Sequence, residues 1–122
     1  YDPLFLTALI ITESSFYNWA KSNRGAYGLM QLKLTTAVAL ASETHLQWKG
    51  TPTLYDPRKN IALGAYYLNK MMTRFGDLTL ALEAYNQGPS RLSRFLRKGY
   101  LPHQRYSRKV FKNYRKIRFQ PI

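Results

Sequence analysis

The stretch from Leu4 to Phe16, LFLTALIITESSF, constrains the fold most, because it puts one carboxyl on an otherwise apolar helical stripe. At helical spacing, Glu13 continues a face that should pack against the core. The positions three, four, seven and eight residues before it are all large and apolar: Ile10, Leu9, Leu6 and Phe5. The spacing therefore predicts an amphipathic first helix with an acid at its C-terminal end.

Two physical effects act on a carboxyl placed there. Burial disfavours the ionised form, and the negative end of the helix dipole disfavours it as well. Both effects predict a raised pKa for Glu13, and a carboxyl that stays protonated near neutral pH can act as a general acid. Two other interpretations remain open from these residues alone: a solvated Glu in the last turn, and a core Glu with a hydrogen-bonded partner.

The remaining pattern predicts an all-α fold of one compact domain with five to seven helices. Asp2-Pro3 and Asp56-Pro57 supply an N-cap followed by proline at the first helical position. The first helix is expected to end between Phe16 and Trp19, and the second of these helices to reach about Phe75. No strand with sustained alternation of apolar and polar residues is recognisable in the sequence.

In the shorter segments the helical spacing of apolar residues extends over fewer positions. We expect helices over residues 36–42 (capped by Thr35), 78–85 and around 92–96, then a basic last helix lined by Tyr106, Val110, Tyr114 and Ile117. Residues 28–31 are expected to form a short helical turn, and residues 43–55 a loop. The sequence Asn86-Gln87-Gly88-Pro89 is a strong turn signal.

Composition excludes several kinds of chemistry. The 122 residues contain no Cys and only two His, which excludes disulfides and thiol nucleophiles and makes a zinc site unexpected. Neither a Ser-His-Asp arrangement nor a glycine-rich phosphate loop is present. Of the six acids, Asp2, Asp56 and Asp77 are interpreted as caps and Glu43 as a loop residue, which leaves Glu13 and Glu83 in apolar helical surroundings. We therefore expect acid–base chemistry without metal or cofactor.

No apolar run is long enough to span a membrane, and the first residues do not resemble a signal peptide. The sequence is therefore expected to be an excised or processed domain, residues 1–122, of a longer chain.

The net charge of +13 is concentrated at the C-terminal end. Residues 91–122 hold eleven Lys or Arg and no Asp or Glu. Such a field favours an anionic partner, although a solvated basic face that keeps the protein soluble explains it equally well.

Several motifs, in order along the chain, resemble one known family. They are ALIITESSF, then A-x-S-x-x-G-A-x-G-L-M-Q from Ala20 to Gln31, DPRKNIALGAYYL from Asp56, AYNQGP from Ala84 to Pro89, and YSRKV from Tyr106. Together they are similar to the catalytic domain of soluble lytic transglycosylases and span nearly the whole chain.

This resemblance implies a goose-lysozyme-like helical fold around a glycan groove. It implies cleavage of the β-1,4 bond between N-acetylmuramic acid and N-acetylglucosamine in peptidoglycan, with a 1,6-anhydro product. By the same resemblance Glu13 is the single catalytic acid/base. The implied substrate-binding residues are Ser22, Gly28, Met30, Gln31, Tyr85, Asn86 and Tyr106, with Tyr106 reaching toward Glu13.

The implied partner is the peptidoglycan glycan strand, in the periplasm of a bacterial cell envelope, and the protein is expected to act as a monomer. Membrane attachment is left to parts of the chain outside this sequence. No nucleic-acid partner is expected, because no nucleic-acid-binding fold signature is present.

Departures from the family pattern leave other functions open. Glu83 stands where the family commonly has Ala, and no acid precedes Tyr106 in residues 101–105. Glu83 could serve as the second carboxylate of a lysozyme-like hydrolase, or it could face away and pair with an Arg or Lys. A non-catalytic basic module that binds an anionic polymer is an alternative of a different class, and a degenerate, scaffolding transglycosylase is a third.

Overall fold

The structure is a computed structural model and describes residues 1–119. Within this range the chain is mainly helical, as predicted, with one small antiparallel hairpin. In chain order the elements are α1 (Pro3–Ser14), β1 (Ala26–Tyr27), β2 (Leu32–Lys33), α2 (Leu34–Thr44), α3 (Thr51–Leu54), α4 (Pro57–Phe75), α5 (Leu78–Gln87), α6 (Pro89–Arg97) and α7 (Arg105–Arg118). None of these helices is both long and apolar enough to cross a membrane.

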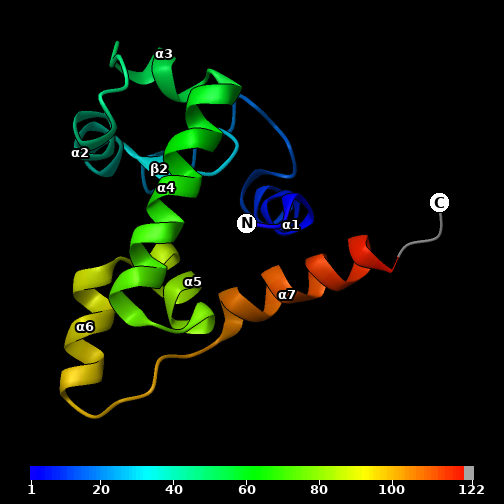
Figure 1. The fold of residues 1–122 in the computed structure, drawn as a ribbon, viewed down its shortest axis with the longest axis vertical. Coiled ribbons are helices and arrows are strands. Elements are labelled where there is room, and N and C mark those ends of the chain that lie inside the picture. The colour runs from blue at the N-terminus through cyan, green and yellow to red at the C-terminus, as the bar shows by residue number, and fades with distance from the viewer. Residues whose placement is uncertain (120–122) are drawn as a thin grey trace.

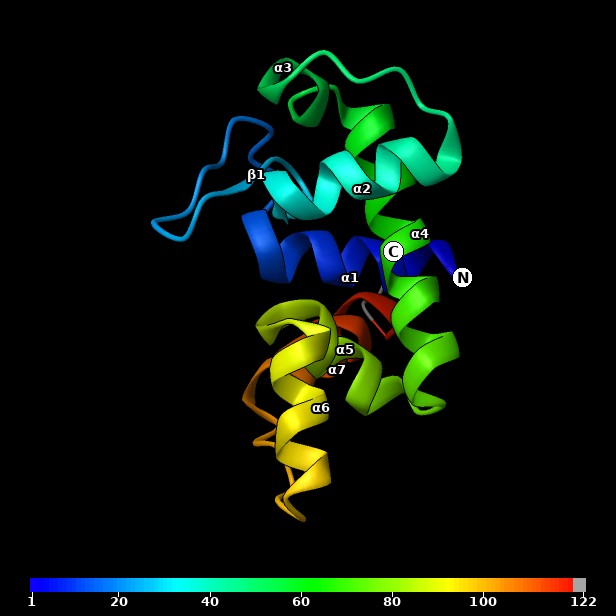
Figure 2. The ribbon, with the colours of Figure 1, turned by 90° about the vertical axis from the view of Figure 1, so that its left-hand side faces the viewer.

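The longest helix, α4, joins the two ends of the molecule (Figure 1). One end holds α2, α3 and the hairpin, and the other holds α5 and α6. Helix α1 lies between these two parts (Figure 2) and packs on α7, while α4 packs on α5. Fully buried leucines fill the interior, among them Leu9, Leu54, Leu63, Leu68 and Leu82.

Three predicted aspartate caps are confirmed. Asp2 accepts a hydrogen bond from the Leu4 N–H at 2.9 Å, and Asp77 accepts one from the Leu80 N–H at 2.9 Å. Asp56 accepts bonds from the N–H groups of residues 58 and 59. Each carboxylate satisfies backbone donors that a helix start leaves without partners.

The first helix ends earlier than predicted, at Ser14. Ser15 and Phe16 both have left-handed backbone angles, with φ of 51° and 63°, so the helix cannot continue toward Trp19. The Ser14 hydroxyl donates to the Leu29 carbonyl at 2.8 Å, which fixes the end of α1 against the hairpin. Glu13 consequently sits in the last complete turn.

The prediction of a helical turn over residues 28–31 was wrong. These residues form the turn of the β1–β2 hairpin, in which Ala26 pairs with Lys33 and Tyr27 with Leu32. Helix α2 starts directly at the end of this hairpin and has no side-chain cap, so Thr35 does not have the predicted capping role. The predicted loop over residues 43–55 contains the short helix α3.

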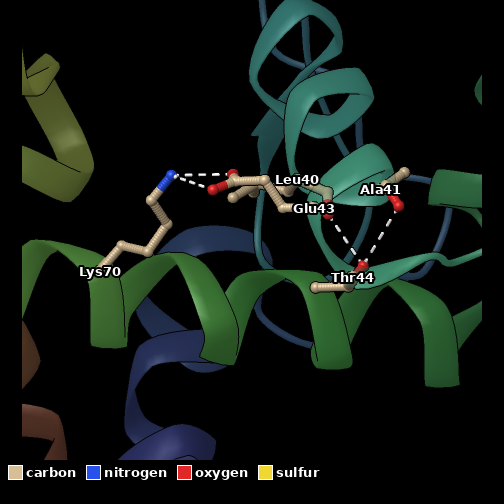
Figure 3. Close-up of polar contacts among 5 residues, drawn as sticks. All are labelled: Leu40, Ala41, Glu43, Thr44 and Lys70. Carbon is tan, nitrogen blue, oxygen red and sulfur yellow. Dashed lines mark hydrogen bonds and ion pairs between the residues drawn. The ribbon is translucent and has the colours of Figure 1, made fainter.

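Glu43 belongs to the last turns of α2 and not to a loop. Its two carboxylate oxygens each accept a hydrogen bond from Lys70 Nζ of α4, at 2.8 Å (Figure 3). In the same turn, the Thr44 hydroxyl donates to the Leu40 carbonyl. The ion pair links α2 to α4, but both side chains are about two-fifths exposed, so its contribution to stability is small.

Candidate active site

Glu13 lies at the boundary between the core and a cleft. Phe5, Leu9 and Ile10 of the predicted stripe are buried, and Leu6 packs against the core at its edge. Tyr106 Oη donates a hydrogen bond to Glu13 Oε2 at 2.5 Å. Burial raises the pKa of Glu13 to about 7, although the hydrogen bond from Tyr106 acts in the opposite direction. Glu13 therefore exchanges its proton near neutral pH.

The two residues of this pair come from opposite ends of the sequence, 93 positions apart. Tyr106 stands in the first turn of α7, and the packing of α7 on α1 brings it to Glu13. Burial, followed by the charge of Glu13, raises the pKa of Tyr106 well above its usual value. Tyr106 thus stays protonated and serves as a hydrogen-bond donor.

Glu83 of α5 supports the start of α7. Its side chain is fully buried, and Oε2 accepts a hydrogen bond from the Ser107 N–H at 2.9 Å. A carboxylate at this position satisfies an otherwise unpaired donor and interacts favourably with the helix dipole. Because Ser107 directly follows Tyr106, this contact also fixes the residue that binds Glu13.

The expected pairing of Glu83 with an Arg or Lys is not found within residues 1–119. The ionisable neighbour is His103, whose Nδ1 lies 3.8 Å from Glu83 Oε1. Oε1 has no hydrogen-bond partner in the described part of the chain. Glu83 does not line the cleft.

The hairpin that faces Glu13 is held by Asn60 of α4, a residue that the sequence analysis missed. Asn60 is fully buried; its Oδ1 accepts from the Met30 N–H at 2.8 Å, and its Nδ2 donates to the carbonyls of Tyr27 and Leu54. Its position four residues before Gly64, on the buried side of α4, was the available signal.

Gly28 is required at the start of this turn. Its φ is +79°, and a Cβ there would lie 2.3 Å from both the Asn60 Nδ2 atom and the Leu54 carbonyl oxygen. Any other residue would displace the asparagine that holds the hairpin.

Gln31 and Ser22 shape the loop beside the hairpin. Gln31 Nε2 donates to the carbonyls of Ala20 and Gly28 at 3.2 and 2.9 Å, and the residue itself has φ of +50°. Ser22 Oγ accepts hydrogen bonds from the N–H groups of Arg24 and Ala26. These bonds order the residues that face Glu13 before any ligand is present.

A cleft of about 290 Å³ opens at the Glu13 carboxyl. Five residues singled out in the sequence line it: Glu13, Ser22, Gln31, Tyr85 and Asn86. The sequence analysis missed the other residues of its wall, which are Arg24, Ala26, Leu32, Lys33, Thr36, Tyr67, Gly88 and Pro89. Among residues 1–119, Glu13 is the single carboxyl that lines the cleft.

Three of the singled-out residues lie behind the wall of the cleft. Gly28 forms the hairpin turn, and Tyr106 contacts Glu13 from the core side. Met30 is fully buried against Gly64, so its side chain is not exposed to the cleft. Its backbone contributes instead, because the Met30 carbonyl accepts a hydrogen bond from Tyr85 Oη at 2.7 Å.

Residues 1–106 match the transglycosylase SLT domain family. The chain is 39% identical to the transglycosylase of Enterobacteria phage PRD1 over 87 residues, which cover 71% of the chain and 29% of the phage protein.

Two solved structures share the fold. The 70 kDa soluble lytic transglycosylase of Escherichia coli superposes with a TM-score of 0.82 and 26% identity, covering 96% of this chain and 22% of that one. An inactive glutamate-to-glutamine mutant of the lytic transglycosylase Slt from Pseudomonas aeruginosa gives a TM-score of 0.71 and 33% identity, covering 91% of this chain and 18% of that one.

The chain therefore belongs to the transglycosylase SLT domain family. Its fold is the lysozyme-like helical fold of the soluble lytic transglycosylases, as the sequence analysis predicted. The chain spans less than a third of the length of the relatives it matches.

Proposed function

We propose that the protein is a peptidoglycan lytic transglycosylase and that Glu13 is its only catalytic acid and base. The observation that carries this proposal is the Glu13 carboxyl, which lines the cleft with a pKa of about 7. A general acid works best when its pKa lies near the working pH. Family membership and the lytic transglycosylase names of the two solved structures support the choice of reaction.

In the proposed reaction, protonated Glu13 gives its proton to the oxygen of the β-1,4 bond between muramoyl and glucosaminyl units. The bond from muramoyl C1 to that oxygen breaks, and the departing sugar leaves with a new hydroxyl. Positive charge develops at C1, and the Glu13 carboxylate accepts the proton of the muramoyl C6 hydroxyl as its oxygen bonds to C1. The product is a 1,6-anhydro sugar, Glu13 is protonated again, and no water is consumed.

This route suits a cleft with one carboxyl. Hydrolases of the usual type need a second carboxylate, about 5 Å away for retention and roughly 6.5–9.5 Å away for inversion. Glu83, the candidate for that role, is buried beneath α7 and outside the cleft. A nucleophile supplied by the substrate needs no such group and benefits from intramolecular proximity.

We assign sugar contacts to the side chains that surround Glu13 on the cleft wall: Ser22, Gln31, Tyr85 and Asn86. Asn86 stands in the last turn of α5, which continues to Gln87 and brings the amide to the cleft. Gln31 uses its amide N–H groups within the protein, which leaves its amide oxygen to accept from a sugar hydroxyl. The proposal implies action as a monomer at the bacterial cell envelope, on its periplasmic side.

Digestion of purified sacculi followed by mass spectrometry tests the reaction. The wild-type protein should release fragments with anhydromuramoyl ends, and Glu13→Gln should lower their rate of release by about a hundredfold to ten-thousandfold. Glu43→Gln is the matched control, because Glu43 lies on the surface of α2 and pairs with Lys70. Reducing muramic acid ends from the wild type would instead identify a hydrolase, and full activity of Glu13→Gln would remove the proposed acid.

A further inference from the structure

The segment that contains α6 and α7 carries an exposed and unneutralised positive charge. Every Lys and Arg between residues 91 and 118 is exposed: Arg91, Arg94, Arg97, Lys98, Arg105, Arg108, Lys109, Lys112, Arg115, Lys116 and Arg118. None of them forms an ion pair with a carboxylate in residues 1–119. One acid lies near the end of α7, Asp2, which accepts a hydrogen bond from Tyr114.

These cations follow the outer sides of the two helices. Along α7 they recur every three or four residues from Arg105 to Lys116, which places them on one side of the helix. The residues that bury α7 against α1 and α5, including Tyr106 and Val110, occupy the opposite side. On α6 the exposed arginines follow the same spacing, while Leu92 is buried. The charge is therefore presented outward.

Two exposed apolar side chains form the tip of the loop between these basic helices. The loop that joins α6 to α7 contains Tyr100 and Leu101, which are 60% and 90% exposed. Leu101 is the most exposed large apolar side chain among residues 1–119, and Arg97, Lys98 and Arg105 flank the loop in sequence. Figure 1 shows this loop at the end of the molecule opposite α3.

We propose that this surface, residues 91–118, binds an anionic phospholipid bilayer. Lys and Arg bind lipid phosphates, while a tyrosine and a leucine at the tip can enter the interface between headgroups and acyl chains. Each Lys or Arg of a polybasic segment near such a surface adds to its attraction to the anionic headgroups. A nucleic acid would be attracted by the same charges but would give an exposed leucine no comparable apolar environment.

Binding in this way leaves the cleft open. None of the eleven cations, and neither Tyr100 nor Leu101, lines the cleft at Glu13. The protein can therefore rest on a membrane through residues 91–118 and still admit a glycan strand. Membrane binding and glycan cleavage are thus separate properties that separate variants should affect.

Sedimentation with vesicles tests the proposal, using the 122-residue chain and vesicles of phosphatidylcholine with or without phosphatidylglycerol. We expect binding only to the anionic vesicles. Leu101→Ser should weaken it about tenfold or more, since burial of a leucine contributes about 1.5–3 kcal/mol. Lys112→Glu with Lys116→Glu should abolish it, whereas the control pair Lys49→Glu with Arg58→Glu, at the other end of the molecule, should change it far less.

Two outcomes would overturn the proposal. One is binding to anionic vesicles that Leu101→Ser leaves unchanged, and the other is binding to an oligonucleotide without binding to vesicles. Release of anhydromuramoyl ends from sacculi should be the same for Leu101→Ser and wild type. Failure of membrane binding would therefore leave the proposed catalytic function untouched. In the same way, absence of glycan cleavage would leave the proposed membrane binding untouched.

Discussion

Glu13 and Glu83 are the two carboxyls that the sequence places in apolar helices, and the structure puts them in opposite circumstances. Glu13 lines a cleft and receives a hydrogen bond from a tyrosine hydroxyl, while its burial raises its pKa to about 7. Glu83 is fully buried away from the cleft and receives a hydrogen bond from a backbone N–H at the start of α7. The first arrangement favours proton exchange, and the second holds the Glu83 side chain in place as a hydrogen-bond acceptor.

The comparison shows that burial alone does not identify a catalytic acid. Ionised Glu13 lowers the stability of the folded protein, because the pKa of the group is higher in the folded state than in the unfolded chain. Glu83 raises stability, because without it the Ser107 N–H would lack its partner. The two are connected, since Glu83 fixes the helix start that carries Tyr106 to Glu13.

Replacement of Glu83 should give the largest effect on stability. Glu83→Ala removes the acceptor of a buried N–H, its interaction with the helix dipole and the packing of two methylenes, for a loss of about 3–5 kcal/mol. Urea unfolding measures this loss. Glu83→Gln keeps an acceptor and nearly the same volume, so it should lose much less.

A different result would assign Glu83 a catalytic role. If both Glu83 variants remained as stable as wild type but lost glycan cleavage, Glu83 would be a catalytic base and not a structural acceptor.

Replacement of Glu13 should increase the stability of the folded protein at raised pH, whereas replacement of Glu83 decreases it. As the pH rises, the unfolded chain releases this proton near pH 4.5 and the folded protein near pH 7, so wild-type stability falls across that window. The difference of 2.5 pH units corresponds to about 3 kcal/mol. Glu13→Gln has no such proton. The free energy of unfolding of the variant minus that of the wild type should therefore be about 3 kcal/mol larger at pH 8 than at pH 4.

Urea unfolding of both proteins at the two pH values measures this gain, and the other ionisable groups cancel in the comparison. An equal difference between variant and wild type at pH 4 and pH 8 would show that the Glu13 carboxyl titrates as it does in water.

The smallest of these effects is expected from Tyr106→Phe. The Tyr106 hydroxyl stabilises the Glu13 carboxylate, so its removal should raise the pKa of Glu13 further. A hydrogen bond to a charged group is worth about 1.5–3 kcal/mol, which corresponds to a rise of about 1–2 pH units. The alkaline limb of the pH–rate profile should move upward by that amount, and an unchanged limb would mean that another group sets it.

Much of the fold could be predicted because its signals are local. Asp2, Asp56 and Asp77 cap helices through contacts within four residues, and the apolar stripe before Glu13 repeats at the helical period. The hairpin could not be predicted in this way. Its strands have two residues each, too few for alternation to be visible, and Asn60 holds it through residues 30 and 33 positions away.

The residues of the candidate site also fall into those that the sequence could predict and those that it could not. Glu13 was recognisable from its own helix, and the family resemblance added Ser22, Gln31, Tyr85 and Asn86, which the structure brings to the cleft. Met30 was included by resemblance alone, and its burial against Gly64 depends on how α4 packs on the hairpin. The partner of Glu83 was missed because a backbone N–H leaves no trace in a sequence.

The contact between Glu13 and Tyr106 joins the C-terminal end of α1 to the first turn of α7. During synthesis Glu13 is made 93 residues before Tyr106, so it exists for a time without the helix that packs against it. A partly made or C-terminally shortened chain would hold Glu13 in water with ordinary acidity. The proposed proton donor therefore keeps its proton near neutral pH only when α7 has packed on α1, which ties the onset of activity to the completion of folding.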